Sequence, residues 1–279
     1  MGIKKIREFF RYVEMNPLVY TENLRDAYLT KSVAGNQLKG KKVMITGGTG
    51  GIGVALALRF LCEDCHIMLC ARNKEKLDIV IKYLNDKISF TSIEPIIMDL
   101  KDENSIVKVV EALDSACPNI LVNNAGVFTK IDSKREFFFV TKKEFSDVWD
   151  VNYKGTVLLS NLIAEKMNQS EGVIINISSI CADSRKTQFI PYGISKAAIK
   201  KYTAFLSEKY ENVQTNAILP GSVATSMIGL YMDKDISRDC NALYHPALPE
   251  EIAALAAFLA TGVGKYLTED VTASACEIL

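Results

Sequence analysis

The chain has 279 residues, of which 48% are hydrophobic, so it is long enough for a single α/β domain with a sizeable core. Its 33 basic and 33 acidic residues balance, which argues against nucleic acid or an acidic membrane surface as the main partner. No apolar run approaches the roughly 18 residues of a membrane-spanning helix, and we expect no stable membrane insertion.

Seven cysteines are scattered through the chain, and no secretory signal peptide is evident. This pattern predicts free thiols and a cytoplasmic location. Cys62 and Cys65 form a CxxC, but there is no second pair and the chain has only two histidines. We therefore predict no metal site, and we interpret the pair as buried, reduced cysteines beside a strand rather than as a redox centre.

Residues 1–40 precede the first predicted strand and form an N-terminal extension. Apolar residues recur at helical spacing from Ile3 to Val13, with basic residues off that stripe, and Asn16-Pro17 ends this helix. A basic amphipathic helix can lie on a membrane, or it can dock on its own domain or on a partner subunit, which we favour. Gly35-Asn36-Gln37 is interpreted as a hinge before a single domain over residues 41–279.

A glycine-rich stretch, TGGTGGIG from Thr46 to Gly53, separates a short strand-like apolar run from a run of strong helix formers. Strand, glycine turn and helix in this order predict a dinucleotide site, with a glycine-rich hairpin tip as the alternative. Gly47 permits a tight turn, Gly51 lets backbone approach a pyrophosphate, and Gly53 lets the helix pack closely on the strand. The helix N-terminus then offers N–H groups to the phosphates.

Strands and helices alternate along the rest of the chain. Strands are predicted over Lys41 to Ile45, His66 to Cys70, Ile93 to Met98, Ile120 to Val122, Val173 to Ile177, Gln214 to Leu219 and near Val271. Helices are predicted after the caps Asn73 and Asp102, from a capping box at Thr141 and Glu144 past Leu158, from Tyr192 to Tyr210, and from Pro249 to Ala260. This order predicts a single-domain doubly wound parallel sheet, a Rossmann fold, with helices on both faces and ligands at the carboxyl ends of its strands.

Tyr192 and Lys196 stand one turn apart on one face of a predicted helix. A phenol has a pKa of about 10, and a nearby ammonium favours the phenolate and lowers that pKa. Such a pair can exchange a proton with an alcohol or carbonyl while a nicotinamide exchanges hydride. Taken alone, YxxxK is also common on helix surfaces.

Several motifs in chain order resemble those of the short-chain dehydrogenase/reductase family, and the resemblance covers about residues 41 to 270. The glycine motif TGxxxGxG is matched from Thr46 to Gly53, and NNAG is matched from Asn123 to Gly126. The PG motif is Pro220-Gly221, followed by Thr225 at a position where the family uses a hydroxyl to hold the nicotinamide carboxamide.

The resemblance implies four catalytic residues: Asn152, Ser179, Tyr192 and Lys196. Tyr192 would be the general acid for carbonyl reduction or the base for alcohol oxidation. Lys196 would lower the pKa of Tyr192 and hold the nicotinamide ribose, Ser179 would hydrogen-bond the substrate oxygen, and Asn152 would keep a water in a proton relay. Ser179 lies 13 residues before Tyr192, the family's usual spacing, whereas strand alternation points Ser178 to the other face.

The resemblance also implies a set of cofactor contacts. These are Gly47, Thr49, Gly51, Ile52, Gly53, Arg72, Asp99, Leu100, Asn124, Ala125, Gly126, Tyr192, Lys196, Pro220, Gly221 and Thr225. Asp99 and Leu100 match the position that contacts adenine, although Asp99 could instead mark the start of a helix.

The end of the second strand decides which nicotinamide cofactor is preferred. An NAD enzyme needs a carboxylate there for the ribose diol, roughly 20 residues beyond the glycine motif. This chain has Ala71 and Arg72, and Arg72 can pair with a 2′-phosphate in a bidentate geometry. We therefore expect NADP(H), with NAD(H) as the alternative, although Gly50 replaces a second basic residue common in NADP-preferring relatives.

Three features depart from the family pattern. The stretch between Gly126 and Asn152 is longer than usual, and Phe137-Phe138-Phe139 could line a substrate entrance or fold onto the sheet edge. The usual C-terminal VDGG is missing, which puts a tetramer in doubt. We expect a homodimer through the helices that carry Asn152 and Tyr192, with the N-terminal extension replacing some of the lost contacts.

The sequence thus predicts an NADP-dependent carbonyl reductase or alcohol dehydrogenase that acts on a small molecule. The alternatives are a cofactor-binding scaffold or sensor without turnover, and an NAD-dependent sugar or alcohol dehydrogenase. A sugar-nucleotide epimerase or dehydratase is disfavoured because its glycine spacing and larger substrate domain are not evident. Acyl thioesters, sugars, steroids and small ketones all remain open as substrates.

Overall fold

The computed structural model describes residues 32–88, 92–113, 116–129, 140–184, 190–225, 227, 247–264 and 269–273. Within these residues, seven parallel strands form one sheet in the order β3-β2-β1-β4-β5-β6-β7. The strands are β1 Lys42–Ile45, β2 His66–Ala71, β3 Ile93–Ile97, β4 Ile120–Asn123, β5 Gly172–Ile177, β6 Val213–Pro220 and β7 Glu269–Ala273. The strands predicted from the sequence are confirmed.

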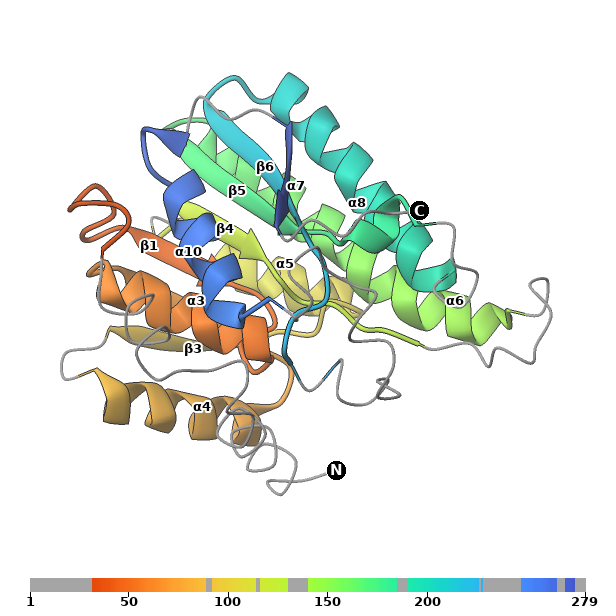
Figure 1. Cartoon of the computed structure of the whole chain (residues 1–279), viewed down its shortest axis with the longest axis horizontal. Helices are drawn as coiled ribbons and strands as arrows, with labels where there is room; N and C mark the ends of the chain where they lie inside the picture. Colours follow the sequence, from red (N-terminus) through yellow and green to blue (C-terminus); the bar gives the residue numbers. More distant parts are fainter. Residues whose placement is uncertain are drawn as a thin grey trace.

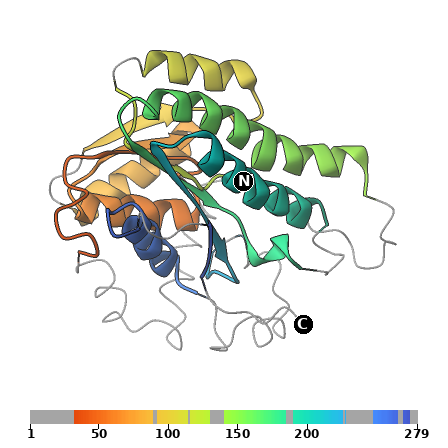
Figure 2. The same cartoon turned by 90° about the horizontal axis from the view of Figure 1, so that it is seen from above.

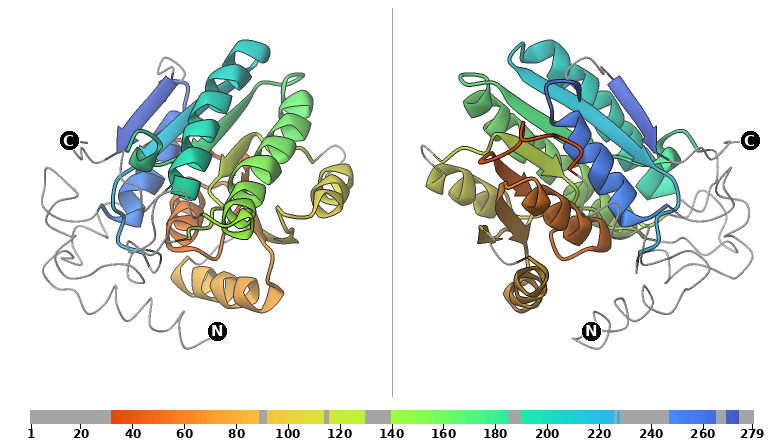
Figure 3. Two further views of the ribbon diagram at one scale, coloured as in Figure 1. Left: turned by 90° about the vertical axis from the view of Figure 1, so that its right-hand side faces the viewer. Right: turned by 60° about the vertical axis from the view of Figure 1, so that its left-hand side comes forward.

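Helices cover both faces of the sheet (Figures 1 and 2). They are α3 Gly51–Cys62, α4 Lys74–Lys87, α5 Glu103–Ala112, α6 Lys142–Trp149, η1 Asp150–Gly155, α7 Thr156–Met167, η2 Ile180–Ala182, α8 Ile190–Lys209 and α10 Pro249–Leu259. Helices α3, α4 and α10 pack on one face, and α5, α7 and α8 pack on the other. Helices α3 and α10 lie side by side (Figure 3). This arrangement confirms the doubly wound fold.

The two faces follow from the alternation of side chains along the strands. In β1, Val43 and Ile45 point into the core under α3 and α10, whereas Met44 points into the core under α5, α7 and α8. The same alternation holds in β4, where Ile120 joins the first core and Leu121 joins the second. Because both faces are covered, these strands read as continuous apolar runs.

Three predicted helix starts are confirmed by their capping contacts. The Asn73 side chain accepts a hydrogen bond from Lys76 N at 2.8 Å, and Asp102 caps α5 in the same way. Thr141 and Glu144 form the expected capping box at the start of α6. These caps could be predicted from the sequence, because each one joins residues only two or three positions apart.

The long helix predicted from Thr141 past Leu158 is wrong in one respect, because a π-helical turn interrupts it. Helix α6 ends at Trp149, η1 spans Asp150–Gly155, and α7 begins at Thr156. Such single π-turns often occur at functional sites, and this one contains Asn152. The turn brings Gly155 so close to Leu100 that an added Cβ would lie 2.1 Å from the Leu100 carbonyl oxygen.

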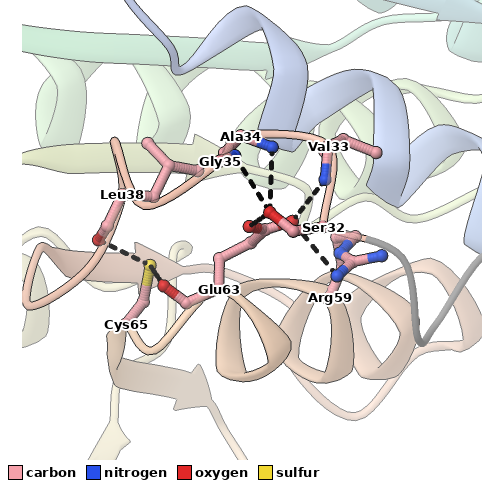
Figure 4. A network of polar contacts seen from close by, with 8 residues as sticks. All are labelled: Ser32, Val33, Ala34, Gly35, Leu38, Arg59, Glu63 and Cys65. Carbon is pink, nitrogen blue, oxygen red and sulfur yellow. Dashed lines mark hydrogen bonds and ion pairs between the residues drawn. The ribbon is translucent and has the colours of Figure 1, made fainter.

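Residues 32–40 are anchored to the domain, although the sequence suggested a hinge at 35–37. Ser32 Oγ donates to the Glu63 carboxylate, and Val33 N donates to Glu63 Oε1 at 2.9 Å (Figure 4). The buried Glu63 also forms an ion pair with Arg59 Nη2 at 3.1 Å. On the other side of this turn, Gln37 Oε1 accepts a hydrogen bond from Gly262 N at 2.9 Å. The N-terminal helix predicted from Ile3 lies outside the described residues.

Replacing Ser32 with alanine should destabilise the domain by roughly 1 kcal/mol, because it removes a hydrogen bond to a buried carboxylate. The Ser32 hydroxyl also accepts from Gly35 N at 3.0 Å, so the turn itself should loosen. Urea unfolding measures the change. The control is Ser207→Ala on α8, whose exposed hydroxyl bonds only locally to Ala204 O, with an expected change within about 0.5 kcal/mol. Equal stability of both variants would contradict the anchor.

The CxxC cysteines differ in exposure, so the prediction that both are buried is wrong. Cys65 is buried and its thiol donates to Leu38 O at 3.2 Å, but Cys62 is exposed. Burial raises the pKa of the Cys65 thiol to about 12, which suits an inert structural thiol. Among the described residues, no cluster of three or more His, Cys, Asp or Glu side chains could hold a metal, and no helix is long and apolar enough to cross a membrane.

Candidate active site

The glycine stretch forms a tight loop where β1 ends. Gly47 has a φ of +66°, a conformation that favours glycine, and an added Cβ would lie 2.7 Å from Ala125 Cα. An added Cβ on Gly53 would lie 2.3 Å from Gly47 O. The loop and the first turn of α3 are therefore packed against each other and against NNAG. Gly53 makes this close contact with the loop itself, rather than with the strand as expected.

The N-terminus of α3 fits a phosphate group. The helix begins at Gly51, and the residue before it, Gly50, has no side chain that could cap the first N–H groups of the helix. Backbone N–H groups at such an end carry partial positive charge and bind anions. Thr49 and Ile52 flank this end and are partly exposed. A dinucleotide pyrophosphate therefore fits the residues that are present.

The NNAG segment after β4 holds the glycine loop in place. Thr46 Oγ1 accepts hydrogen bonds from both Asn124 N and Ala125 N at 3.0 Å. The Asn124 side chain donates to Thr46 O at 2.9 Å and to Gly47 O at 3.2 Å. The Asn124 side chain therefore holds the glycine loop in place, because both of its donor contacts go to that loop. A contact between Asn124 and the cofactor stays a prediction. Gly126 lies deeper, where an added Cβ would be 3.4 Å from Lys196 Nζ.

Asn152 is fixed in the π-turn by three hydrogen bonds. Its Oδ1 accepts from Val127 N at 2.8 Å, while its Nδ2 donates to Val127 O at 3.0 Å and to Ser195 Oγ at 3.0 Å. Ser195 in turn donates to Tyr192 O at 2.7 Å. Asn152 is therefore tied both to the chain that follows NNAG and to the first turn of α8.

The two serines after β5 make different contacts. Ser178 Oγ donates to Lys196 O at 2.9 Å, so Ser178 holds α8 to the strand. Ser179 is the serine whose hydroxyl interacts with Tyr192, and this interaction lowers the pKa of the phenol. Ser179 Oγ also accepts from Cys181 N at 3.1 Å. Ser179 is thus the serine placed beside Tyr192.

Tyr192 and Lys196 lie together, but not in the electrostatic relation that the sequence predicts. Lys196 Nζ is 5.6 Å from the Tyr192 ring centre and donates to Ile177 O at 2.7 Å. Burial lowers the pKa of Lys196 to about 8. Burial also raises the pKa of Tyr192, the nearby Cys181 thiol adds to this, and the Ser179 hydrogen bond opposes it. Burial is the largest cause of the raised pKa of Tyr192, and Lys196 is not among the groups that lower it.

The glycine loop also meets the end of β2. Gly48 N donates to Cys70 O at 2.9 Å, two residues before Arg72. Arg72 is exposed, and it makes no ion pair with any residue that the structure describes. Its neighbour Lys74 is paired with Asp78 at 2.7 Å. Arg72 therefore follows the strand that the loop contacts, and its charge is not paired with any described residue.

Five further predicted contacts lie at or after the ends of β3 and β6. Asp99 Oδ1 accepts from Lys101 N at 2.9 Å, so its side chain supports the turn that leads into α5, as the helix-start alternative proposed. Leu100 is buried against η1. At the end of β6, Pro220 is the last strand residue, Gly221 follows it, and Thr225 is buried. Phe137-Phe138-Phe139 lie outside the described residues.

Sequence reasoning missed several groups that hold the site together. The Ile177 carbonyl binds Lys196, and no sequence pattern reveals a backbone acceptor. Ser195 lies within the YxxxK stretch, and its small polar side chain next to Lys196 was an overlooked clue. Phe128 packs edge-on against the Tyr192 ring, with 5.2 Å between ring centres, and follows NNAG closely enough to have been considered.

These elements can be compared with known proteins. Residues 41–235 match the model of the family described as short chain dehydrogenase. The chain belongs to this family. It is 28% identical over 242 residues to the 3-oxoacyl-(acyl-carrier-protein) reductase FabG of Aquifex aeolicus, over 84% of this chain and 96% of that protein.

Solved structures of similar proteins share the fold. L-sorbose reductase from Gluconobacter frateurii, in complex with NADPH and L-sorbose, has a TM-score of 0.77 and 25% identity over 88% of this chain and 99% of that one. A 3-ketoacyl-(acyl-carrier-protein) reductase from Brucella melitensis, in complex with NADH, has a TM-score of 0.78 and covers 87% of this chain and 100% of that one. At 23% identity, the second likeness concerns the fold alone.

Replacing Gly155 with alanine should destabilise the protein by about 1–3 kcal/mol, because its Cβ would collide with the Leu100 backbone. In an ordinary helix the same change stabilises by about 1 kcal/mol, so the sign of the effect is informative. NADPH binding should weaken as well if the Leu100 loop contacts adenine. Thermal unfolding and fluorescence titration measure the two effects.

Gly262→Ala is the matched control for this glycine substitution. Its Cβ would meet only the end of the flexible Gln37 side chain, at 3.3 Å. A Gly155→Ala protein as stable as this control would show that the approach of η1 to Leu100 is not tight.

Proposed function

We propose that this chain transfers a hydride between NADP(H) and a carbonyl or alcohol substrate, with Tyr192 as the general acid or base. The observation that carries the proposal is the meeting of Ser179, Tyr192, Lys196 and Asn152 near Gly126 of NNAG. These four predicted catalytic residues come from η1, from the segment that follows β5 and from α8. This favours an enzyme over a scaffold without turnover.

The bound nicotinamide would supply or accept the hydride at the substrate carbon. Tyr192 would give its phenolic proton to the carbonyl oxygen as the alcohol forms, or take that proton in oxidation. Ser179 would orient the substrate oxygen, because its hydroxyl already acts on the Tyr192 phenol. Lys196 would contribute positive charge near the reacting oxygen and a contact to the nicotinamide ribose. Asn152 would support a water between these groups.

The resting charges of the pair suit carbonyl reduction. Since the pKa of Tyr192 is raised, the phenol keeps its proton near neutral pH. The pKa of Lys196 is lowered to about 8, so its ammonium is present below that pH and is lost as the pH rises through it. A neutral phenol beside an ammonium is the acid form that donates a proton. Oxidation needs the phenolate and should therefore be favoured at higher pH.

NADP(H) is the proposed cofactor because Arg72 lies at the end of β2 with no ion-pair partner in the part of the chain that the structure describes. The similar L-sorbose reductase was solved with NADPH, and the similar ketoacyl reductase was solved with NADH. These relatives do not decide between the cofactors, so the proposal rests on Arg72 and on the lack of a carboxylate at Ala71.

We also propose a homodimer formed through the helices that carry Asn152 and Tyr192, which are the interrupted helix α6-η1-α7 and α8. On α8, Ile194 and Phe205 are exposed, Phe205 to 60%. A groove of about 510 Å³ between α5, α7 and the end of α8 lies on the same side of the sheet. Exposed apolar side chains over helices favour a protein interface. Light scattering after gel filtration measures the mass of the particle in solution and so tests the homodimer.

The cytoplasmic location expected from the cysteines stays a prediction.

The test of function is a panel of ketones, aldehydes, sugars, steroids and acyl thioesters, followed by the loss of NADPH absorbance. Similar proteins are named as reductases of acyl carrier protein thioesters and of L-sorbose, so both classes belong in the panel. Turnover that depends on Tyr192 supports the proposal. Cofactor binding without turnover of any substrate class would point to the scaffold. Turnover with NAD(H) but not with NADP(H) would point to the NAD-dependent alternative.

A further inference from the structure

A buried chain of polar side chains runs beneath the candidate active site. Asn123 Nδ2 donates to Ser160 Oγ and to Asn176 Oδ1, both at 2.8 Å. Asn176 Nδ2 donates to Thr203 Oγ1 at 2.9 Å, and Thr203 Oγ1 donates to Ile199 O at 2.8 Å. The four side chains are at most 4% exposed. We name Ser160, Asn123, Asn176 and Thr203 the polar chain.

The polar chain joins the four elements on which the site is built. Asn123 and Asn176 are register partners near the carboxyl ends of β4 and β5. Asn176 directly precedes Ile177, whose carbonyl binds Lys196 Nζ. Thr203 lies on α8, seven residues after Lys196, and is therefore on nearly the same face of that helix.

The other end of the polar chain reaches α7, which directly follows the π-turn that carries Asn152. Ser160 lies on α7, eight residues after Asn152 and about two helical turns beyond it. A displacement at the Thr203 end would move the helix that carries Tyr192 and Lys196, and one at the Ser160 end would move the helix that follows Asn152. The polar chain is therefore placed to set the distance between α7 and α8 where both meet the sheet.

The residues of the polar chain are polar side chains in a part of the core whose neighbouring positions are apolar. Leu121 and Ile174 precede Asn123 and Asn176 on the same face of the sheet and are fully buried in the core under α5, α7 and α8. Buried amides are costly unless they are hydrogen-bonded, so their directional bonds allow few alternative arrangements. Apolar contacts alone tolerate repacking with small shifts of a helix.

We propose that Asn176 and Thr203 are positioning residues, which hold α8 so that Lys196 meets Ile177 O and Tyr192 faces Ser179. The inference rests on the proposed function, because it assigns a role to residues that do not touch substrate or cofactor. It predicts that loss of the Asn176–Thr203 bond lowers turnover with little effect on substrate KM. A residue that only stabilises the fold would change the unfolding temperature without changing kcat of the folded enzyme.

Thr203→Val removes the hydroxyl and keeps the side-chain shape, and Thr203→Ser keeps the hydroxyl. With NADPH and the best substrate, at a temperature where each variant is folded, Thr203→Val should lower kcat roughly 10- to 100-fold, because small misplacements of reacting groups are costly. Substrate KM should change less than about 2-fold, since binding common to ground and transition state is retained. Thr203→Ser should keep a kcat near wild type.

Thr215→Val is the matched control. Thr215 is 5% exposed and its hydroxyl donates to Val213 O within β6, so its loss tests burial of a threonine outside the polar chain. This variant should lose stability and keep kcat. If Thr203→Val does not fold, Ser160→Ala opens the other end of the polar chain and should also lower kcat, by about 2- to 10-fold.

Crystal structures of the Thr203 variants read the positioning directly, whatever the substrate. Thr203→Val should lengthen the contact between Lys196 Nζ and Ile177 O beyond hydrogen-bonding distance, and Thr203→Ser should keep it at 2.7 Å. An unchanged contact in Thr203→Val overturns the inference, as does wild-type kcat in that variant. If wild type turns over no carbonyl substrate, the proposed function fails, and the crystal structures alone decide on the positioning role.

Discussion

Replacing Tyr192 with phenylalanine is expected to lower kcat by on the order of 10² or more, in the range of a positioned acid–base group. The substitution removes the phenolic oxygen and keeps the ring that packs against Phe128. NADPH affinity should change little, because Lys196 keeps its bond to Ile177 O. Steady-state rates on the best substrate and fluorescence titration with NADPH measure the two quantities.

Tyr202→Phe provides the control for this tyrosine substitution. Tyr202 is also on α8, but its hydroxyl bonds to Val157 O and Asn161 Oδ1 away from the site. This variant should lose some stability and keep its turnover. Near-wild-type kcat in Tyr192→Phe would remove the acid–base assignment. A Tyr202→Phe protein as inactive as Tyr192→Phe would show that loss of any hydroxyl from α8 disturbs the site indirectly.

Much of the fold was predictable because its determinants are local. The strand β1 and the helix α3 follow from an apolar run, a glycine turn and a run of helix formers in adjacent positions. The caps of α4, α5 and α6 depend on side chains and N–H groups two or three residues apart. Once these elements were known, the parallel sheet followed from their alternation.

The features that sequence reasoning missed depend on contacts between distant segments. The π-turn η1 brings Gly155 against Leu100, and this contact between distant segments leaves no local pattern in the sequence. The anchor of residues 32–35 on Glu63 spans about thirty positions and looks in the sequence like a flexible glycine segment. The raised pKa of Tyr192 was not foreseen, because burial is its largest cause and a sequence does not give burial.

A reversal of cofactor preference is expected when Ala71 is replaced by aspartate and Arg72 by leucine. A 2′-phosphate carries a charge of about −1.5 to −2 near neutral pH by analogy with other phosphate monoesters. A charge-assisted hydrogen bond to it is worth about 1.5–3 kcal/mol, which is roughly 10- to 150-fold in affinity. The absence of a basic residue at Gly50 places wild type toward the lower end of that range. In the variant, aspartate should repel the phosphate and accept the ribose diol.

The structure supplies the reason to choose these two positions and a control for them. Ala71 is the last residue of β2, next to the point where Gly48 N binds Cys70 O, so a carboxylate there would lie beside the glycine loop. Lys74→Leu removes a nearby positive charge that is already paired with Asp78, and it should leave the preference unchanged. Fluorescence titration of wild type, the double variant and the control with NADPH and NADH gives the ratios directly. Equal affinity of wild type for both cofactors would mean that Arg72 is only a solvated surface residue, and the proposed preference would be wrong.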